Sequence, residues 1–329
     1  MSHSILGLDI GGTKCSVVLG KIENGSLRIV AKKSFPTEVS KGFTYYMHTI
    51  QQHIDAILHE SDLIPKEIAA CGISCGGPLD SRKGIIMSPP NLPGWDSIPI
   101  VEIIEKQYGI KTGVQNDANA CALAEWKYGA GKGYSNIIFL TFGTGMGAGL
   151  ILNGKLYVGA NDMAGEVGHI RLERFGPVGY GKAGSFEGFC SGGGIARLAC
   201  TKVYEKMQNG EKVSFCPTPE NLPEISARTV ADAAFEGDEL AREIYRISGH
   251  YLGKALAVLI DVLNPELIIL GSIYRRAQPL IEPSMNEVIR QETVSHAREA
   301  CRIVPAGLGE SIGDYAALSV ASCRLECMP

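Results

Sequence analysis

Hydrophobic and polar positions along the first third of the chain follow two different periods. Residues 5–34 read as three successive strands, and a helical spacing of apolar residues covers Phe43–Leu58. The same two patterns continue and predict strands at Ile68–Ser74 and Lys111–Gln115, with helices at Ile98–Tyr108 and Ala118–Tyr128. Strands and helices that alternate in this way predict an α/β protein.

The second part of the chain shows the same mixture with longer helices. Residues 160–194 are rich in glycine and lack a regular period. Beyond them a strand is predicted at Leu267–Leu270, and helices are predicted at Ile195–Glu205, Thr229–Phe235, Asp238–Leu263, Ala277–Thr293 and Ala316–Ser322. A glycine-rich turn over residues 307–313 precedes the last of these helices.

Two glycine–threonine turns stand at closely matching places in the two halves, and each interrupts a hydrophobic strand pattern. The first runs from Asp9 to Lys14, and the second runs from Thr141 to Met146. Each is followed by a strand and then by an Asn-Gly turn, at Asn24 in one half and at Asn153 in the other. This shared order predicts an internal repeat of two similar domains.

The two turns have the composition of a phosphate-binding site. Glycine has no Cβ, so the backbone can turn sharply and bring several N–H groups against a phosphate. Threonine adds a hydroxyl donor, and Asp9 offers an oxygen ligand for Mg²⁺. Tight turns favour glycine in any case, so a single turn of this kind indicates only a hairpin. The duplication favours a polyphosphate held by two turns from opposite sides.

Composition and charge narrow the class of protein. The 329 residues are 45% hydrophobic and 20% charged, which is typical of a soluble chain long enough for two domains. The net charge of −4 argues against a broad surface for nucleic acid or anionic membrane. No signal peptide is recognised, and the most apolar stretch, Ala255–Leu263, is too short to span a bilayer. The ten cysteines are scattered singly. We expect a cytoplasmic protein without nucleic-acid or membrane partners.

Asn116 and Asp117 stand between the two turns, at a predicted junction of strand and helix. Side chains at such junctions commonly project into a ligand cleft, where an aspartate can deprotonate a hydroxyl. The alternative is an ordinary helix N-cap that satisfies backbone amides. Local sequence does not separate the two interpretations.

Glu166 and His169 place a carboxylate and an imidazole close together between glycines, in a segment without a hydrophobic face. Glu187 is a similar polar residue in the next glycine-rich loop. Fixed carboxylates and imidazoles can hydrogen-bond vicinal hydroxyls, so these residues are candidates for sugar binding. A histidine taken alone is more often structural than a ligand.

Taken together, these motifs resemble the ROK family (repressor, open reading frame, kinase), within the fold of sugar kinases and actin-like ATPases. The resemblance runs from about Ile5 to about Ala321 and rests on ordered segments, namely Asp9–Lys14, Asn91–Trp95, Asn116–Asn119, Gly143–Gly147, Glu166–His169, Glu187 and Ser191–Gly192. It implies a duplicated, ribonuclease H-like α/β fold with two domains around a cleft. The domains would be a small one at 1–116, completed by a C-terminal helix at about 310–329, and a large one at 117–309.

The resemblance also assigns roles to single residues. Asp117 would be the catalytic base. The sugar would be held by Asn91, Asn116, Glu166, His169 and Glu187. ATP, with its Mg²⁺, would be bound by Asp9, Gly11, Gly12, Thr13, Lys14, Thr144, Gly145 and, near the adenosine, Gly271.

The sequence departs from the family pattern in two places. Many relatives hold zinc with one histidine and three cysteines, but here the cysteine places are occupied by Val178, Tyr180 and Ser185. Because thiolates supply most of the affinity of such a site, we expect no structural zinc. Repressors of the family carry a helix-turn-helix before the first turn, whereas only Met1–Ser4 precede it here, so DNA binding is not expected.

The function predicted from the sequence is an ATP-dependent hexose kinase that phosphorylates the 6-hydroxyl of glucose or a related hexose. Fructose, N-acetylmannosamine, N-acetylglucosamine and allose stay open as substrates. A non-catalytic sugar-responsive binding protein and an actin-like nucleotide switch are the alternatives of another class. A homodimer or a homotetramer is expected.

Overall fold

The computed structural model describes residues 2–326, apart from the side chain of Val39, and the chain divides into two compact units. The first unit comprises Met1–Gly133, Gly149–Ala164 and Gly307–Pro329, and the second comprises Tyr134–Ala148 and Gly165–Ala306. The end of the predicted C-terminal helix, at residues 327–329, lies outside the described residues. The predicted division at residues 116 and 117 stays a prediction.

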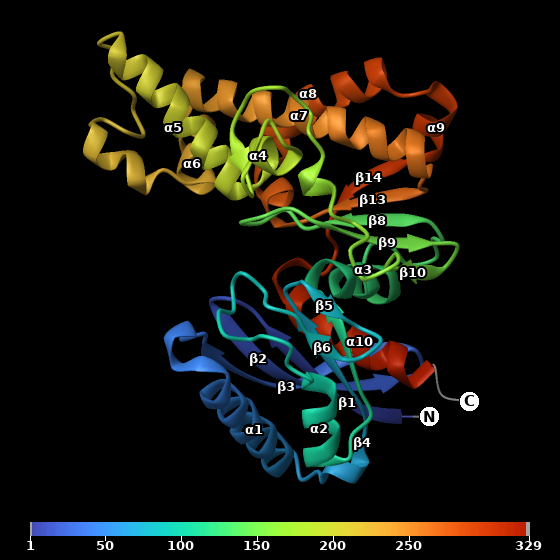
Figure 1. Ribbon diagram of the computed structural model, residues 1–329. Coiled ribbons are helices and arrows are strands. Elements are labelled where there is room, and N and C mark those ends of the chain that lie inside the picture. The colour runs from blue at the N-terminus through green and yellow to red at the C-terminus, as the bar shows by residue number, and fades with distance from the viewer. Residues whose placement is uncertain (1, 327–329) are drawn as a thin grey trace. The chain divides into compact units, whose positions relative to one another are not determined.

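A mixed five-stranded sheet forms the centre of the first unit (Figure 1). Its strand order is β3-β2-β1-β4-β7. The strands β1 (Ser2–Ile10), β2 (Lys14–Glu23) and β3 (Ser26–Pro36) are antiparallel neighbours, whereas β4 (Ile68–Cys75) and β7 (Thr112–Asn116) run parallel to β1. The carboxyl ends of β1, β4 and β7 therefore lie at the same edge of the sheet.

Alternating side chains divide this sheet between two layers of helices. Leu6 and Leu8 of β1 belong to the core that also contains the buried faces of α1 (Gly42–Glu60) and α2 (Ile100–Tyr108). Ile5, one residue away along the strand, packs instead in a cluster with Leu318 of α10 (Ile312–Glu326). Since neighbouring residues of a strand point to opposite faces, this separation follows directly from the sequence pattern.

Small residues let α10 lie very close to the sheet. A Cβ on Gly72 of β4 would come within 2.1 Å of the Ala317 carbonyl oxygen and 2.3 Å of the Ala321 amide nitrogen. No side chain fits between two backbones at that distance. The alanines of α10 and the glycine of β4 together allow this contact.

The first unit also contains α3 (Asp117–Tyr128) and short hairpins. The strands β5 (Leu79–Asp80) and β6 (Ile85–Ile86) form one hairpin, and β9 (Ala148–Leu152) and β10 (Lys155–Tyr157) form another. Gly149 approaches α3, because a Cβ there would lie 2.5 Å from the Ala122 Cβ. Three 3₁₀ turns complete the unit, namely η1 (Val39–Lys41), η2 (Pro65–Glu67) and η5 (Gly309–Ser311).

The two Asn-Gly turns have the same backbone conformation. Asn24 and Gly25 have φ angles of 51° and 78°, and Asn153 and Gly154 have φ angles of 53° and 69°. Two consecutive positive φ values characterise the type I′ turn, for which Asn-Gly is the preferred sequence. The turns join β2 to β3 and β9 to β10, so this part of the predicted repeat is present in the structure.

Three parallel strands run through the second unit in the order β8 (Ile137–Leu140), β13 (Leu267–Leu270) and β14 (Arg302–Pro305). Every residue of β8 and β13 is buried, as expected for strands covered on both faces. The long helices α7 (Glu239–Leu263) and α8 (Ser272–Glu292) pack against each other. The remaining elements are η3 (Val167–His169), β11 (Val178–Gly179), β12 (Lys182–Ala183), α4 (Phe186–Cys190), α5 (Gly192–Gln208), η4 (Pro219–Glu224), α6 (Ala227–Glu236) and α9 (Ser295–Ala300).

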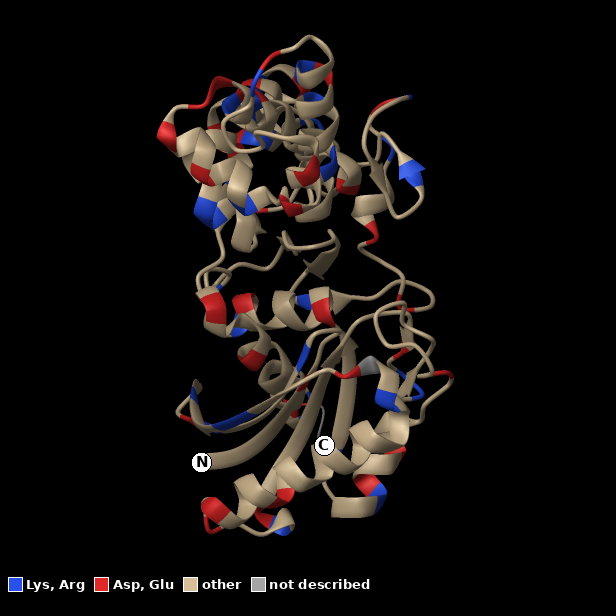
Figure 2. Cartoon of the chain, turned by 90° about the vertical axis from the view of Figure 1, so that its left-hand side faces the viewer, with Lys and Arg blue, Asp and Glu red and all other residues tan. Residues whose placement is uncertain are grey.

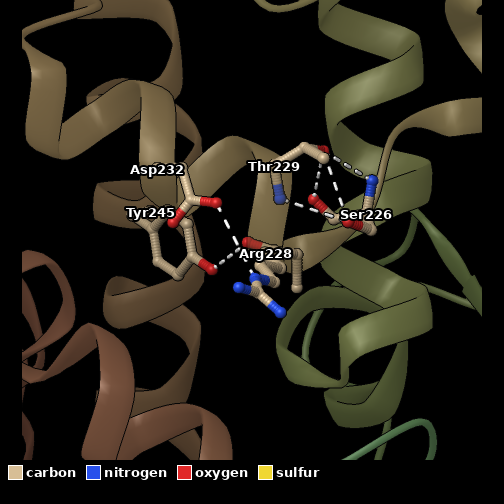
Figure 3. Close-up of polar contacts among 6 residues, drawn as sticks. Ser226, Arg228, Thr229, Asp232 and Tyr245 are labelled. Atoms are coloured by element: carbon tan, nitrogen blue, oxygen red, sulfur yellow. Dashed lines mark hydrogen bonds and ion pairs between the residues drawn. The ribbon is translucent and has the colours of Figure 1, made fainter.

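Local caps fix where α6 begins and how it meets α7 (Figure 3). The Ser226 hydroxyl accepts the Thr229 amide, and the Thr229 hydroxyl accepts the Ser226 amide, which is a reciprocal capping box. The Tyr245 hydroxyl of α7 donates to the Ala227 carbonyl at 2.6 Å. The two helices are thereby joined at the start of α6.

The predicted α/β class is confirmed, and most predicted elements are found within a few residues. The helix predicted from Ala277 begins earlier, at Ser272, because two helical pieces meet at Ala277, whose φ and ψ are non-helical. Charged residues of both signs are interspersed, chiefly on helices and loops (Figure 2). Among residues 2–326, none of the helices combines the length and apolar character needed to span a bilayer.

Candidate functional site

The first glycine turn joins β1 to β2. Its Gly11 amide donates to the Lys14 carbonyl at 3.1 Å, and a Cβ on Gly11 would lie only 2.8 Å from that oxygen. Thr37 closes the turn from the other side, because its amide donates to the Thr13 carbonyl at 2.9 Å and its hydroxyl donates to the Gly11 carbonyl at 2.7 Å. The side chains of Thr13 and Lys14 are exposed on this anchored turn.

Asp9 lies at the carboxyl end of β1, against the start of α10. A Cβ on Gly313 would be 2.7 Å from the Asp9 Oδ2, so glycine is required beside this carboxylate. Burial raises the pKa of Asp9 to about 6, assisted by the negative charges of Asp314 and Asp117 and opposed by Lys32. The Lys32 Nζ also forms a 2.6 Å ion pair with Asp314. An incompletely compensated carboxyl of this kind favours a bound cation.

Asn91 is exposed in a loop that its neighbours fix in place. Leu92 and Trp95 are each only 1% exposed, and Trp95 packs edge-on against aromatic rings of the α1 region. A Cβ on Gly12 would lie 2.8 Å from the Asn91 Cβ, and one on Gly76 would lie 3.1 Å from the Asn91 Oδ1. The Asn91 side chain therefore lies between the first glycine turn and the end of β4.

The structure separates the roles of Asn116 and Asp117 at the start of α3. The Asn116 Oδ1 accepts the Asn119 amide at 3.1 Å, so Asn116 is the N-cap. The Asp117 Oδ1 accepts the Ala118 amide at 2.8 Å, and its side chain remains accessible to solvent. Surrounding protein atoms restrict hydration of this carboxyl and raise its pKa above the ordinary value.

Two cysteines show that Asp9 and Asp117 share one environment. Burial raises the pKa of Cys75 and of Cys121, and in both cases the charges of Asp117 and Asp9 raise it further. Thiols held protonated in this way are structural rather than nucleophilic. The two carboxylates thus face a common region at the carboxyl ends of β1, β4 and β7.

The second glycine turn, at residues 141–147, follows β8. The Thr141 amide donates to the Gly147 carbonyl at 2.9 Å, and the Gly147 amide donates to the Thr141 hydroxyl at 2.8 Å. The Gly192 amide, at the start of α5, donates to the Gly143 carbonyl at 2.7 Å. Thr144 and Gly145 are exposed at the tip.

Glu187 lies directly against this second turn. Its Oε2 accepts the Met146 amide at 3.1 Å, and a Cβ on Gly145 would lie 3.1 Å from the same oxygen. The Ser185 hydroxyl caps α4 by accepting the Gly188 amide at 3.1 Å, which fixes where the helix that carries Glu187 begins. A predicted sugar ligand and a predicted phosphate turn are thus in contact within the second unit.

Glu166 is the N-cap of the 3₁₀ turn η3 and His169 is its last residue, and the His169 amide donates to the Glu166 carbonyl at 3.2 Å. The His169 ring meets the Tyr180 ring edge-on at a centroid distance of 5.1 Å. The Lys182 Nζ donates to the His169 carbonyl at 2.7 Å. Both the ring and the backbone of His169 are therefore held by the loop that follows it.

Gly271 ends β13 beside the base of the second turn. Its amide donates to the Leu140 carbonyl at 3.0 Å, and a Cβ there would lie 2.8 Å from the Phe142 amide nitrogen. The adjacent Ser272 hydroxyl donates to the Phe142 carbonyl at 3.2 Å. A side chain at position 271 would collide with the strand that leads into the turn.

The predicted site residues fall into two groups, one in each unit. The first unit contains Asp9, Gly11, Gly12, Thr13, Lys14, Asn91, Asn116 and Asp117. The second unit contains Thr144, Gly145, Glu166, His169, Glu187 and Gly271. Each group combines a glycine turn with carboxylate and amide or imidazole side chains.

Comparison with known proteins identifies the family. The family model described as "ROK family" matches residues 5–322. The chain belongs to the ROK family. The fold of sugar kinases and actin-like ATPases predicted from the sequence is thereby confirmed.

Relatives within the ROK family include enzymes and regulators. A glucokinase from Thermotoga maritima is 31% identical, with 98% of each chain covered. A solved ROK glucokinase from Streptomyces griseus, in complex with glucose and AMPPNP, has a TM-score of 0.75 and 27% identity, and the match covers 97% of this chain and 99% of that one. A xylose repressor from Caldicellulosiruptor bescii is 26% identical over 88% of this chain and 71% of its own length.

Positions 178, 180 and 185, where the family resemblance implies zinc cysteines, carry other residues in this chain. Val178 and Tyr180 are exposed in the β11–β12 hairpin, while Ser185 is buried and caps α4. Within the described part of the chain, no group of three or more His, Cys, Asp or Glu side chains could hold a metal ion. The residues present do not fit the family zinc site, and the absence of structural zinc stays a prediction.

Sequence reasoning missed several residues around the candidate site. Asp314 and Lys32 shape the surroundings of Asp9, and Lys182 supports His169. The glycine-rich segment before the last helix was a signal for the first of these, since Gly313 makes room for Asp9. The two lysines had no local signal, because each acts through a contact that only the fold creates.

Proposed function

We propose that the protein is an ATP-dependent hexose kinase that transfers the γ-phosphoryl group to the 6-hydroxyl of glucose or a close relative. The observation that carries this proposal is the position of Asp117, an accessible carboxylate with a raised pKa at the carboxyl ends of parallel strands, next to Asn116. The similarity to glucokinases over nearly the whole chain supports it.

The first unit would supply the base and part of the sugar and phosphate contacts. Asp117 accepts the proton of the attacking hydroxyl, and the accessible amides of Asn91 and Asn116 bind neighbouring hydroxyls. The anchored turn from Gly11 to Lys14 offers its exposed side chains and backbone amides to phosphate oxygens. Asp9 would hold Mg²⁺, which supplies charge neutralisation and alignment for the phosphate chain.

The second unit would supply the remaining contacts. Glu166, His169 and Glu187 present acceptors and an imidazole for sugar hydroxyls, while Thr144 and Gly145 bind phosphate oxygens. Because Glu187 holds the Met146 amide, sugar and phosphate contacts are linked through one carboxylate. The adenosine would lie near Gly271, where only a residue without a side chain fits.

Positioning carries most of the chemistry in this mechanism. The attacking oxygen must lie in line with the γ-phosphorus, and fixed hydrogen bonds to the sugar provide that alignment. A base with a raised pKa is a better proton acceptor than an ordinary aspartate once it is ionised. Without a hexose, Asp117 has no aligned hydroxyl, so we expect only slow hydrolysis of ATP.

A coupled assay for ADP tests the proposal. The purified protein is incubated with ATP, Mg²⁺ and, separately, glucose, fructose, mannose, N-acetylmannosamine, N-acetylglucosamine or allose. We expect hexose-dependent ADP formation, with glucose or a close relative giving the highest kcat/KM. ATP hydrolysis at one rate with or without every hexose would contradict the proposal and favour an actin-like nucleotide switch.

The second candidate is a sugar-responsive binding protein without catalysis, and the similarity to a xylose repressor favours it. Calorimetry with the same sugars separates the two, since a binding protein would show hexose affinity but form no ADP. Cytoplasmic location, the absence of nucleic-acid partners and a homodimeric or homotetrameric state stay predictions.

A further inference from the structure

The segment at residues 158–164, between β10 and η3, contains a buried carboxylate that the proposed chemistry does not use. Asp162 is only 7% exposed and has a φ of 62°. Its Oδ2 accepts the Ser81 amide at 2.9 Å, and its Oδ1 accepts the Ser81 hydroxyl at 2.6 Å. The two residues are 81 positions apart and both belong to the first unit.

The backbone at position 162 would suit glycine better than aspartate. Left-handed φ values cost a side chain about 1 kcal/mol, and a buried carboxylate also loses its hydration. Both hydrogen bonds to Ser81 have good geometry and use the two different oxygens, which compensates for that burial. The contact with Ser81, and not the turn, is therefore what the aspartate side chain contributes at this position.

One end of this contact supports the loop of Asn91. Ser81 begins the turn of the β5–β6 hairpin, and Ile86 of β6 exchanges hydrogen bonds of 2.9 Å with Ile98 at the end of that loop. At the start of the hairpin, the Pro78 carbonyl accepts the Met87 amide at 2.9 Å. Movement of the hairpin would therefore be transmitted to the loop that presents Asn91.

The other end of the contact leads directly to Glu166. The Ala164 amide closes the segment by donating to the Val158 carbonyl at 3.2 Å, and Gly165 follows with a φ of 91°. With Gly165 the chain enters the second unit. There the Gly165 carbonyl accepts the Ala148 amide at 2.8 Å. Asp162 is thus the last buried polar anchor of the first unit before the chain reaches Glu166.

We propose that Asp162, through its paired hydrogen bonds to Ser81, is a positioning residue for the hexose. It fixes the segment that leads to Glu166 on the same hairpin that supports Asn91. This inference rests on the proposed function, in which Asn91 and Glu166 bind the sugar. Loss of the pair should weaken hexose binding more than ATP binding, because the phosphate turns are anchored by other contacts.

Three variants isolate the contact. Asp162→Gly removes the carboxylate but suits the left-handed backbone, so it loses the pair without adding strain. Asp162→Asn keeps an oxygen acceptor for the Ser81 amide and tolerates the same φ, so it should rescue function. Ser81→Ala removes the hydroxyl donor and leaves the amide. Asn24→Gly is the matched control, since Asn24 is also left-handed but is exposed in a remote turn.

The measurement is the KM for hexose, the KM for ATP and kcat of each variant, together with the Kd for hexose from calorimetry. For Asp162→Gly we expect hexose KM and Kd to rise roughly tenfold, with ATP KM within about twofold of the wild type. Ser81→Ala should give an intermediate rise, and Asp162→Asn and Asn24→Gly should stay near the wild type. The double variant should be no worse than Asp162→Gly, because both changes remove one interaction.

An unchanged hexose KM and Kd in both Asp162→Gly and Ser81→Ala would overturn the inference, as would an equal rise for ATP and hexose. Should Asp162→Gly fail to fold, Ser81→Ala alone decides. If the wild-type protein phosphorylates no hexose, the proposed function is wrong. In that case the Kd comparison still tests whether the pair positions a bound sugar, and a wild type without hexose affinity overturns both.

Discussion

The two glycine turns are built on the same sequence pattern but are held in different ways. The first is closed by Thr37 and lies beside two carboxylates from other elements, Asp117 and Asp314. The second is closed by its own Thr141 and is supported by the carboxylate of Glu187, which accepts a turn amide. The copies thus share the glycine-threonine sequence pattern, while the contacts that close each turn and the placement of charge around it differ.

This difference suggests that the carboxylates of the two units have different roles. In the first unit the pKa values of Asp9 and Asp117 are raised, which suits proton and cation handling. In the second unit Glu187 accepts a hydrogen bond from the backbone of the turn, which suits a rigid surface for phosphate and sugar. Changing acids in the two units should therefore affect different kinetic parameters.

The largest effect is expected for Asp117→Asn. Loss of the base should lower kcat by about 10²- to 10⁴-fold while hexose Kd changes little. Folding should be retained, because the amide oxygen can still accept the Ala118 amide. Steady-state kinetics and circular dichroism check this, with Asp232→Asn on the surface of α6 as control. A kcat close to the wild type would remove Asp117 from the role of base.

Glu187→Ala should come next and should affect both substrates. Without the bond to the Met146 amide the second turn loses support, and kcat/KM should fall about 100-fold with higher KM values for ATP and hexose. Glu187→Gln keeps an oxygen acceptor, so its ATP KM should stay near the wild type while its hexose KM rises. Equal behaviour of the two variants would show that the contact with the turn is unimportant.

Asp9→Asn should lower the activity and raise the stability of the first unit. Activity should fall about 10- to 100-fold if the carboxylate orients the cation. The pKa of Asp9 is raised from 3.8 to about 6 by burial, so the folded state favours the protonated form. As the pH rises from about 4 to about 6, the free energy of unfolding therefore decreases, because the unfolded state loses the Asp9 proton first. The decrease is complete above about pH 6 and absent below about pH 4.

Thermal unfolding over a pH series tests this sign. After a discount for partial exposure, the variant should be about 1 kcal/mol more stable than the wild type near pH 8, with the gap closing towards pH 4. A gain that is the same at both ends of the series would mean that the charge of Asp9 is not its cause.

The smallest effect is expected at Lys182. Lys182→Met removes the donor to the His169 carbonyl and should raise hexose KM by about threefold, with Lys182→Arg closer to the wild type.

Elemental analysis of protein purified without added metal should find no zinc, since hydrogen bonds hold this loop. Near one zinc per chain would contradict that expectation.

The sequence predicted the parts of this molecule that have local causes. Asn-Gly at positions 24 and 153 specified type I′ turns, and Asn116 was recognised as a candidate helix cap. The contact between Asp162 and Ser81 was beyond sequence reasoning, because no local pattern relates polar residues 81 positions apart. The start of α8 was misplaced because its first turns precede a kink at Ala277, and two prolines beyond it obscure the helical period.

The close approach of α10 to Gly72 also bears on how the chain folds during synthesis. The sheet face formed by Ile5, Val18 and Ala70 has its partners in Leu318 and Ala321. While the ribosome is still translating the middle of the chain, that apolar face has no cover and is open to chaperones and to other nascent chains. The core of the first unit can therefore close only after α10 has been synthesised.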